Sequence, residues 1–342
     1  MTMGDPRGIG PEVALAALAE ATPGSFHRVR LVGVREVFQR AAFERGLTTL
    51  FHRYAEDLLE IRDPLDESGP DPGRILLMEL PHPFGTLTPD QAGRWAGRAV
   101  QAAVRELRPE LGDALVTAPI DKHALALGGY AFPGHTEFLA HLAGSRAVAM
   151  MLVAGALRVS LVTGHVPLAA VPAEVTPERI RQVFALTRDA LRAGFGIEAP
   201  RIALCGLNPH AGDGGALGSE EMRILEPLVA ELRGEGGDVT GPVPGDTAFV
   251  RAVQGEFDAV LALYHDQGMI PIKLHGFGAG VNVTLGLPFV RTSPDHGTAL
   301  ELAGTGRARA DSFRLALQLA RDLADRPGFT QPGLQGSFGL VT

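Results

Sequence analysis

The stretch DAVLALYHDQGMIPIKLHGFGAGVNVTLGLPFVR, residues 258–291, decides the fold prediction for this chain. It opens with an uninterrupted apolar run at 259–264, which is short and aliphatic enough to be a strand buried on both faces. The run stops at His265 and Asp266, so an imidazole and a carboxylate follow the carboxyl end of that strand. Ligands of open α/β sheets bind at this end. The stretch therefore predicts an α/β protein with a site at the edge of its sheet.

The second half of the same stretch adds groups that bind anions. A second strand is expected at 281–285 with the polar Asn282 among aliphatic residues, and Arg291 closes a third short run. Together with Lys273 these residues supply two cations and an amide, which are suited to a phosphate or a carboxylate. Lys273 is alternatively a surface lysine, but its apolar surroundings, IPIKLHGFG, favour a site lysine at least as strongly.

Working outward, strands and helices alternate along the chain. Strands are expected at 30–34, 114–118 and 202–206, and helices at 36–45, 88–107, 176–194 and 311–324. Residues 147–153 and 157–163 flank a short Gly-containing loop, which predicts an antiparallel hairpin and therefore a mixed sheet. Residues 63–73 are rich in Pro, Gly and Asp and are expected to form a surface loop.

The composition limits the classes of partner. The 342 residues carry a net charge of −8 without a long basic run, which argues against nucleic acid and anionic membrane as partners. Cys205 is the only cysteine, so an intramolecular disulfide is excluded and a reducing compartment is indicated. It is expected to be a small buried residue and not a nucleophile. The start of the chain has no secretory signal pattern, and a cytoplasmic protein is predicted.

Three of the eleven histidines share one sequence context. His165, His210 and His265 each follow an aliphatic strand by a few residues at most. Parallel neighbours end at the same edge of a sheet, so these imidazoles can converge although they are far apart in sequence. Three protein ligands with one open position form the catalytic pattern of zinc and similar ions. Their spacing fits no short metal motif, and hydrogen-bonded loop histidines are the alternative.

Four further residues are candidates for the site. His135 and Thr136 stand between a Gly/Pro turn and a helix, where Thr136 is a possible cap and His135 is expected to hydrogen-bond to substrate. Asp246 is either a helix N-cap or a site carboxylate. Asp266 beside His265 is expected to orient a ligand, to neutralise a metal or to act as a base. Because no GxGxxG fingerprint follows a strand, the spacing alone leaves a metal-dependent hydrolase, an aldolase and a dehydrogenase equally open.

Several longer motifs resemble those of one known family. They occur in order along nearly the whole chain, and the sequence is similar through them to the 4-hydroxythreonine-4-phosphate dehydrogenase family of vitamin B6 biosynthesis. The motifs are TMGDPRGIGPE (2–12), TAPIDKHAL (117–125), FPGHTEF (132–138), VTGHVPL (162–168), LNPHAGDGGALGSEE (207–221), GPVPGDTAF (241–249), YHDQGMIPIK (264–273) and VNVTLGLPFVRTSPDHGTALELAG (281–304).

The resemblance implies a fold, an assembly and cofactors. The implied fold has two α/β/α domains with mixed, mostly parallel sheets around a central cleft, like isocitrate and isopropylmalate dehydrogenases. We expect residues 1–124 with 275–342 to form the first domain, and 125–274 to form the second domain and the dimer interface. The implied cofactors are NAD or NADP and one divalent ion per site, Zn, Mg or Co. The implied assembly is a homodimer with shared active sites.

The resemblance also implies residue roles and a reaction. His165, His210 and His265 would be the metal ligands, the last supplied by the partner subunit. His135, Thr136, Lys273, Asn282 and Arg291 would bind substrate, and Asp246, Asp266 and Lys273 would serve catalysis. The implied reaction oxidises the C3 hydroxyl of 4-phosphohydroxy-L-threonine to a β-keto acid, which loses CO₂ to give 3-amino-2-oxopropyl phosphate.

Other functions stay open beside this resemblance, and the sequence departs from the family pattern at two places. A paralogue that oxidises phosphorylated threonate or erythronate is the close rival, and a metal-dependent hydrolase or aldolase or a phosphosugar-binding protein is the distant one. The family pattern has a strand before the TMGDP turn, which is almost absent here, so a late start or a truncated first strand is expected. Arg7 also occupies a turn position where a small residue is expected.

Overall fold

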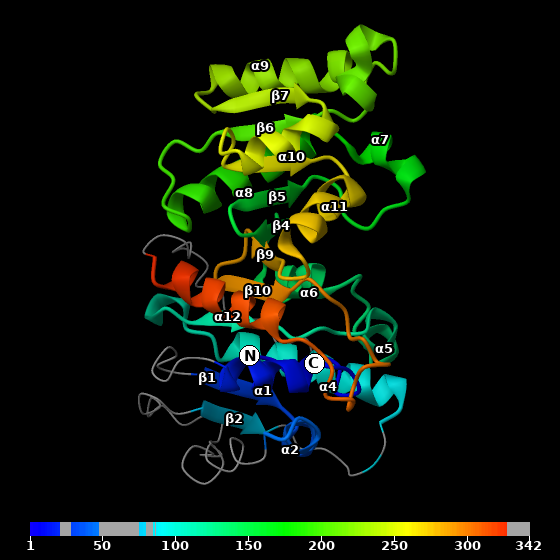
Figure 1. Ribbon diagram of the computed structural model, residues 1–342, viewed down its shortest axis with the longest axis vertical. Coiled ribbons are helices and arrows are strands. Elements are labelled where there is room, and N and C mark those ends of the chain that lie inside the picture. The colour runs from blue at the N-terminus through cyan, green and yellow to red at the C-terminus, as the bar shows by residue number, and fades with distance from the viewer. Residues whose placement is uncertain (21–28, 48–74, 80–84, 86, 327–342) are drawn as a thin grey trace. The chain divides into compact units, whose positions relative to one another are not determined.

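The chain folds as two compact units. The computed structural model describes residues 1–20, 29–47, 75–79, 85 and 87–326 (Figure 1). Among the described residues, the first unit contains Met1–Ser145 and Pro288–Arg321, and the second contains Arg146–Leu287 with 322–326. The sequence interpretation had placed these two boundaries after residues 124 and 274. The surface loop predicted at 63–73 lies outside the described residues.

The first unit combines short parallel strands with helices. Its strands are β1 (Val29–Gly33), β2 (Ile75–Glu79), β3 (Ala114–Val116) and β10 (Val290–Pro294). Its helices are α1 (Gly10–Ala19), α2 (Arg35–Glu44), α4 (Pro89–Arg105), α5 (Lys122–Leu127), α6 (His135–Ala143) and most of α12 (Asp311–Ala324). Helix α12 packs on β10, where Thr292 Oγ1 donates to Ala316 O at 2.7 Å.

The first residues of the chain take the place of the expected N-terminal strand. β1 pairs in parallel with β2, and β3 pairs in parallel with β10. Thr2 forms parallel bridges to Val32 and to Thr117. Its amide donates to Val116 O at 3.0 Å, and the amide of Met3 donates to Val32 O at 3.0 Å. Residues 1–3 therefore link β1 to β3 as a short strand.

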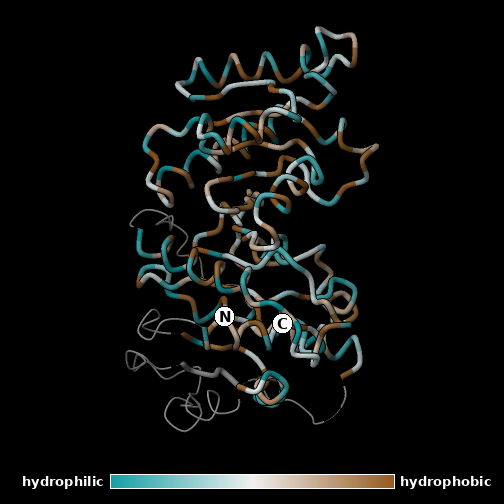
Figure 2. The backbone as a smooth tube through the Cα atoms, in the orientation of Figure 1, coloured by the Kyte–Doolittle hydropathy of each residue, from teal (hydrophilic) through white to brown (hydrophobic). Residues whose placement is uncertain are grey.

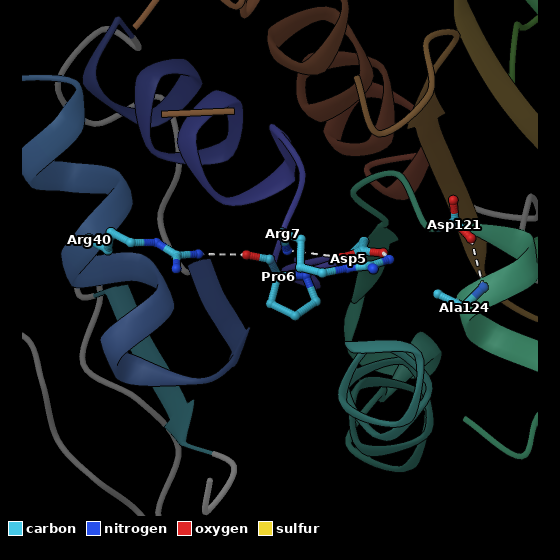
Figure 3. Close-up of polar contacts among 6 residues, drawn as sticks. All are labelled: Asp5, Pro6, Arg7, Arg40, Asp121 and Ala124. Carbon is cyan, nitrogen blue, oxygen red and sulfur yellow. Dashed lines mark hydrogen bonds and ion pairs between the residues drawn. The ribbon is translucent and has the colours of Figure 1, made fainter. Parts of the chain in front are cut away.

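The turn that follows is tightly built, and Arg7 has a structural role in it. The Arg7 guanidinium forms a bidentate contact with the buried Asp5 carboxylate, with Nη2–Oδ2 at 2.7 Å and Nε–Oδ1 at 3.0 Å (Figure 3). Arg40 Nη2 donates to Pro6 O at 2.8 Å. Gly4 has φ +71°, and a Cβ there would lie 2.3 Å from Pro119 O, so only glycine fits. Arg7 thus neutralises a carboxylate that would otherwise be buried alone.

The second unit is built around a larger sheet. Its strands are β4 (Ala149–Ala154), β5 (Leu157–Leu161), β6 (Ile202–Cys205), β7 (Val239–Val243), β8 (Ala259–Ala262) and β9 (Val281–Leu285). Its helices are α7 (Val171–Glu174), α8 (Pro177–Ala193), α9 (Glu226–Gly234), α10 (Gly245–Val253) and α11 (His265–Gly276), with 3₁₀ turns at Leu168–Ala170 and Pro209–Gly215 and a π-helical turn at Glu221–Leu225. In Figure 2, α9 alternates between hydrophilic and hydrophobic segments, as expected for a helix covering a sheet.

The strand order in this sheet confirms the predicted mixed α/β fold. The order is β9-β4-β5-β8-β6-β7. β4 pairs antiparallel with both β5 and β9, whereas β5, β8, β6 and β7 pair in parallel. The predicted hairpin is β4–β5. Cys205 is fully buried at the end of β6, and burial raises the pKa of its thiol to about 12, which confirms a core residue.

Helix α11 was missed by the sequence interpretation. It begins directly at His265 and continues to Gly276 with Pro271 inside it, although proline normally breaks a helix. Gly268 explains how α11 reaches the sheet, because a Cβ there would lie 2.6 Å from Leu161 Cδ2. The chain therefore has a helix here although Gly268 and Pro271 both disfavour one locally.

Candidate functional site

The three strands that precede the candidate metal ligands are neighbours in the second unit. β8 lies between β5 and β6 and is parallel to both. The carboxyl ends of these strands therefore lie at one edge of the sheet. His165, His265 and His210 follow β5, β8 and β6, respectively, so all three come after strands that end at the same edge.

Two of the three imidazoles are adjacent. The ring centroids of His165 and His265 are 4.9 Å apart within one chain. His265 Nδ1 lies 2.7 Å from Asp266 Oδ1. A proton on Nδ1 that is held by this carboxylate leaves the Nε2 lone pair of His265 available to a ligand. The Asp266 side chain is 74% exposed, so its charge is largely solvated and it acts here by orienting the ring.

His210 occupies a turn of unusual backbone geometry. It is exposed and has φ 53°, in the left-handed region that non-glycine residues rarely adopt. Among the described residues, no three His, Cys, Asp or Glu side chains are close enough together to hold a metal ion. The donor set itself fits a divalent ion, because two adjacent imidazoles and a third from a neighbouring strand end are the ligand types that zinc prefers. The full triad stays a prediction.

The remaining candidates of the second unit are dispersed over different elements. Asp246 is exposed in the first turn of α10, and Pro244 occupies the N-cap, so the capping alternative for Asp246 is wrong. Lys273 is exposed on α11. Asn282 lies in β9, and its Oδ1 is a buried acceptor without a hydrogen-bond partner in the described part of the chain. A buried acceptor of this kind calls for a partner that comes from elsewhere, such as a ligand.

In the first unit, Arg291 is a buried and oriented cation. It is the second residue of β10, not the end of a strand as predicted, and is only 1% exposed. Its Nη2 and Nε donate to Thr117 Oγ1 at 2.6 and 3.2 Å. Burial lowers the pKa of Arg291 to about 9, while the negative charge of Glu137 acts in the opposite direction. The guanidinium therefore remains charged at neutral pH.

His135 lies in the electrostatic field of Arg291. It begins α6 after Gly134, which occupies the N-cap, so the predicted capping by Thr136 is wrong. His135 Nε2 is buried and has no hydrogen-bond partner within the described residues. Burial, and secondarily the charge of Arg291, lower the pKa of His135 well below its ordinary value of 6.5. A neutral imidazole next to a buried guanidinium is suited to bind an anionic substrate group.

Two residues that shape these sites were missed. Thr117 orients Arg291, and the available signals were its position near the end of the 114–118 strand and at the start of the TAPIDKHAL motif. Glu221 is 1% exposed and accepts bonds from the backbone ahead of His210. Its position within LNPHAGDGGALGSEE was visible, but nothing local in the sequence distinguishes it from the neighbouring Glu220.

The comparisons with known proteins identify the family of this chain. The profile of the family described as "Pyridoxal phosphate biosynthetic protein PdxA" matches residues 26–320. The chain belongs to the PdxA family. A member from Geobacter metallireducens, named 4-hydroxythreonine-4-phosphate dehydrogenase, is 46% identical over 330 residues, which are 95% of this chain and 94% of that protein.

Two further PdxA-family comparisons bear on function and fold. A Bradyrhizobium diazoefficiens protein named as a D-threonate 4-phosphate dehydrogenase is 42% identical over 341 residues, covering 95% of this chain and 96% of that protein. The crystal structure of 4-hydroxythreonine-4-phosphate dehydrogenase from Klebsiella pneumoniae is 39% identical with a TM-score of 0.77, covering 94% of this chain and 96% of that one. The family and the fold predicted from sequence are thus confirmed. Within the described residues, no helix has both the length and the apolar character needed to cross a bilayer.

Proposed function

We propose that this chain is a 4-hydroxythreonine-4-phosphate dehydrogenase of pyridoxal phosphate biosynthesis. The substrate would be 4-phosphohydroxy-L-threonine and the oxidant NAD or NADP. The observation that carries the proposal is the buried Arg291, fixed by Thr117, beside the unsatisfied Nε2 of His135, in a chain 46% identical to a relative with this name.

The charged groups of the substrate require fixed cations. Arg291 presents a planar, charged guanidinium whose plane is held by Thr117, and a group of this kind binds a carboxylate or a phosphate strongly. His135 is neutral and supplies a hydrogen bond without adding charge. Thr136, Lys273 and Asn282 are the further proposed substrate contacts. We assign the phosphate to neither cation specifically.

His165, His210 and His265 would hold a divalent ion. Such an ion, when bound, polarises a hydroxyl oxygen and stabilises negative charge that develops on it. The chain contributes to this by keeping Nδ1 of His265 engaged with Asp266, which directs Nε2 outward. Asp266, Asp246 and Lys273 are the proposed acid–base groups.

The proposed reaction balances in two steps. The C3–H bond breaks and its hydride passes to the nicotinamide of NAD(P)⁺, while the C3 hydroxyl gives its proton to a base. The resulting β-keto acid then loses its carboxylate as CO₂, and a proton replaces it to give 3-amino-2-oxopropyl phosphate. Asp266 stands beside His265 and is exposed, so it can exchange a proton with solvent.

A second candidate is oxidation of D-threonate 4-phosphate. It is supported by the 42% identity to the relative of that name, which is close to the value for the dehydrogenases of the threonine substrate. The two substrates differ at C2, where threonate carries a hydroxyl and the threonine derivative an amine. The identities to the two kinds of relative therefore favour neither the amine nor the hydroxyl at C2.

We further propose a homodimer formed through the second unit. Ile270, Leu274 and Phe277 lie at i, i+4 and i+7 along α11 and its C-cap and are 58%, 69% and 85% exposed. This spacing places them on one helix face, and exposed apolar faces of this kind commonly mark protein interfaces. A second copy would cover the face isologously. Because His265 begins the same helix, the dimer would lie next to the histidine edge, which is the edge of the sheet followed by His165, His210 and His265.

The activity is tested by following NAD(P)H formation with each of the two phosphorylated substrates, with and without a chelator. We expect reduction of nicotinamide with 4-phosphohydroxy-L-threonine and its loss on chelation. Preference for D-threonate 4-phosphate would transfer the assignment to the second candidate. Absence of NAD(P)H with both substrates in the metal-loaded protein would contradict the dehydrogenase assignment.

The dimer is tested by Phe277→Glu, with sedimentation and light scattering as measurements. A charge at the most exposed residue of the apolar face should convert the dimer into a monomer while circular dichroism stays unchanged. The matched control is Phe43→Glu, another exposed phenylalanine, which lies in the first unit (77% exposed). A monomeric parent, or a variant that remains dimeric, would contradict this interface.

A further inference from the structure

The turn that carries His210 has a conformation that its sequence disfavours. His210, Ala211 and Asp213 have φ values of 53°, 53° and 43°, and the intervening Gly212 has φ 82°. The left-handed region is unfavourable for residues with a Cβ because of the close approach of the carbonyl oxygen. A run of such residues persists only where the surrounding structure enforces it, and such runs are concentrated at functional sites.

A single buried carboxylate holds the beginning of this turn. Glu221 Oε1 accepts from the amides of Leu207 and Asn208, both at 2.8 Å. Its Oε2 accepts from Asn208 Nδ2 at 2.9 Å. The three donors occupy both carboxylate oxygens of a residue that is 1% exposed. The two residues that precede Pro209 and His210 are therefore fixed by one side chain.

The packing around Glu221 leaves no room for adjustment. A Cβ at Gly212 would lie 2.8 Å from Glu221 Oε2, and a Cβ at Gly206 would lie 2.8 Å from Ala211 Cα and 3.4 Å from Glu221 Oε1. A Cβ at Gly218 would lie 2.3 Å from Asn208 Nδ2. The glycines on both sides of the turn thus allow the backbone to close around the carboxylate.

Two further features support a dedicated role for Glu221. It begins the π-helical turn Glu221–Leu225, a form that occurs frequently at functional sites. Burial alone would raise the pKa of Glu221, but the bonds from Asn208 and Leu207 outweigh it and lower the pKa, so the carboxylate stays ionised. Glu220 adds an outer contact by accepting from the same Asn208 Nδ2 at 2.8 Å.

We propose that Glu221 is a positioning residue that holds residues 207–214 in the left-handed turn and thereby places His210 for metal binding. This inference depends on the proposed function, in which His210 is a metal ligand. Glu221 acts through the backbone and does not touch the metal. Outer groups that orient a metal ligand typically change metal affinity by about 10- to 100-fold when they are removed.

The test measures Zn²⁺ binding by calorimetry in the full-length protein, without substrate or nicotinamide, together with amide hydrogen exchange of a peptide covering 207–214. The variants are Glu221→Gln, which retains the shape of the side chain, and Glu221→Ala. The control is Glu226→Gln, an exposed glutamate at the start of α9. We expect Zn²⁺ affinity to fall about 10-fold in Glu221→Gln and up to about 100-fold in Glu221→Ala, with faster exchange in 207–214.

A second-site change separates positioning from general stability. Ala211→Gly removes the Cβ from a residue in the left-handed region, so the turn no longer depends as strongly on Glu221. In the Glu221→Gln background, Ala211→Gly should recover part of the lost Zn²⁺ affinity, although it makes no new contact. Failure to recover any affinity would count against the inference.

The outcomes distinguish failure of this inference from failure of the proposed function. Unchanged exchange in 207–214 of both Glu221 variants overturns the inference. If His210→Ala loses Zn²⁺ while both Glu221 variants keep the affinity of the parent, only the positioning role has failed. If His210→Ala also keeps that affinity, the ligand role of His210 has failed, and the positioning role fails with it.

Discussion

The buried Arg291 of the first unit and the histidine edge of the second are built in opposite ways. Arg291 lies inside a strand, is 1% exposed and bonds to Thr117 on the neighbouring strand segment. His165 and His210 are exposed in loops, and His265 begins a helix. Burial therefore preorganises Arg291, whereas the three histidines lie on the connections that follow three parallel strands.

This difference indicates how the two regions divide the proposed work. A buried guanidinium keeps one orientation, because moving it would break bonds that water cannot replace. Residues on loops at a sheet edge can approach a ligand from several directions, and their positions depend on local supports such as Asp266 and Glu221. The following predictions separate a rigid anchor in the first unit from an adjustable metal-binding edge in the second.

The largest effect is expected at the histidine edge. His210→Ala should remove metal binding and lower kcat/KM on the order of 1,000-fold, because metal catalysis contributes several kcal/mol. The fold should be unchanged, since His210 is exposed. Metal content and turnover are the measurements, with His275→Ala, another exposed histidine of the same unit, as the control. Full metal content in His210→Ala would remove this residue from the ligand set.

The next largest effect is expected from the planar guanidinium of Arg291. Arg291→Lys keeps the charge but loses the planar fork, so kcat/KM should fall roughly 10- to 100-fold, the equivalent of one charged hydrogen bond of about 1.5–3 kcal/mol. Steady-state kinetics measure this change, and metal affinity should stay at the value of the parent. Arg309→Lys, at a 77% exposed arginine, is the control. Wild-type kinetics in Arg291→Lys would show that this cation does not bind substrate.

A smaller effect is expected from Thr117, which orients Arg291. Thr117→Val removes the acceptor of two Arg291 bonds and should raise KM roughly fivefold, for about 1 kcal/mol of lost orientation. Thr117→Ser retains the hydroxyl and should restore the parental KM. If valine and serine behave alike, the hydroxyl is not what holds the guanidinium.

The smallest effect is a pH dependence of stability in the first unit. The pKa of His135 is lowered in the native state from 6.5, by burial first and by Arg291 second, so the unfolded chain binds the proton more readily. The contribution of His135 to stability is therefore full above pH 6.5 and is lost as the pH falls from there toward the native pKa. Urea unfolding of the parent and of His135→Gln across this range should show a shallower pH slope for the variant. Identical slopes would contradict a lowered pKa.

Much of the local structure was predictable from sequence. The strand at 281–285 and the helix at 311–324 have the predicted bounds, and the hairpin across Gly155 is antiparallel as expected. The capping of α4 also follows its sequence signal, with Thr88 N donating to Gln91 Oε1 at 3.1 Å. These features depend on residues a few positions apart, so periodicity and turn chemistry are sufficient to find them.

The sites were predictable only in part. The positions of His165, His210 and His265 after strands were visible, because strand ends are local features. The capping roles of Thr136 and Asp246 were each wrong by two residues, since Gly134 and Pro244 take those positions. Helix α11 was hidden because Gly268 and Pro271 locally disfavour a helix, and its packing against β5 overrides that preference.

By itself, the sequence determined the strands that precede the three histidines, the polar groups that follow those strands and the family that the motifs resemble. Only the tertiary structure decided that β8 lies between β5 and β6, that Arg291 meets Thr117 across 174 positions of sequence, and that Glu221 holds the turn of His210. The physical reason is that strand order, burial and hydrogen bonding to the backbone arise from contacts between distant segments. Neither the spacing nor the propensity of nearby residues contains that information.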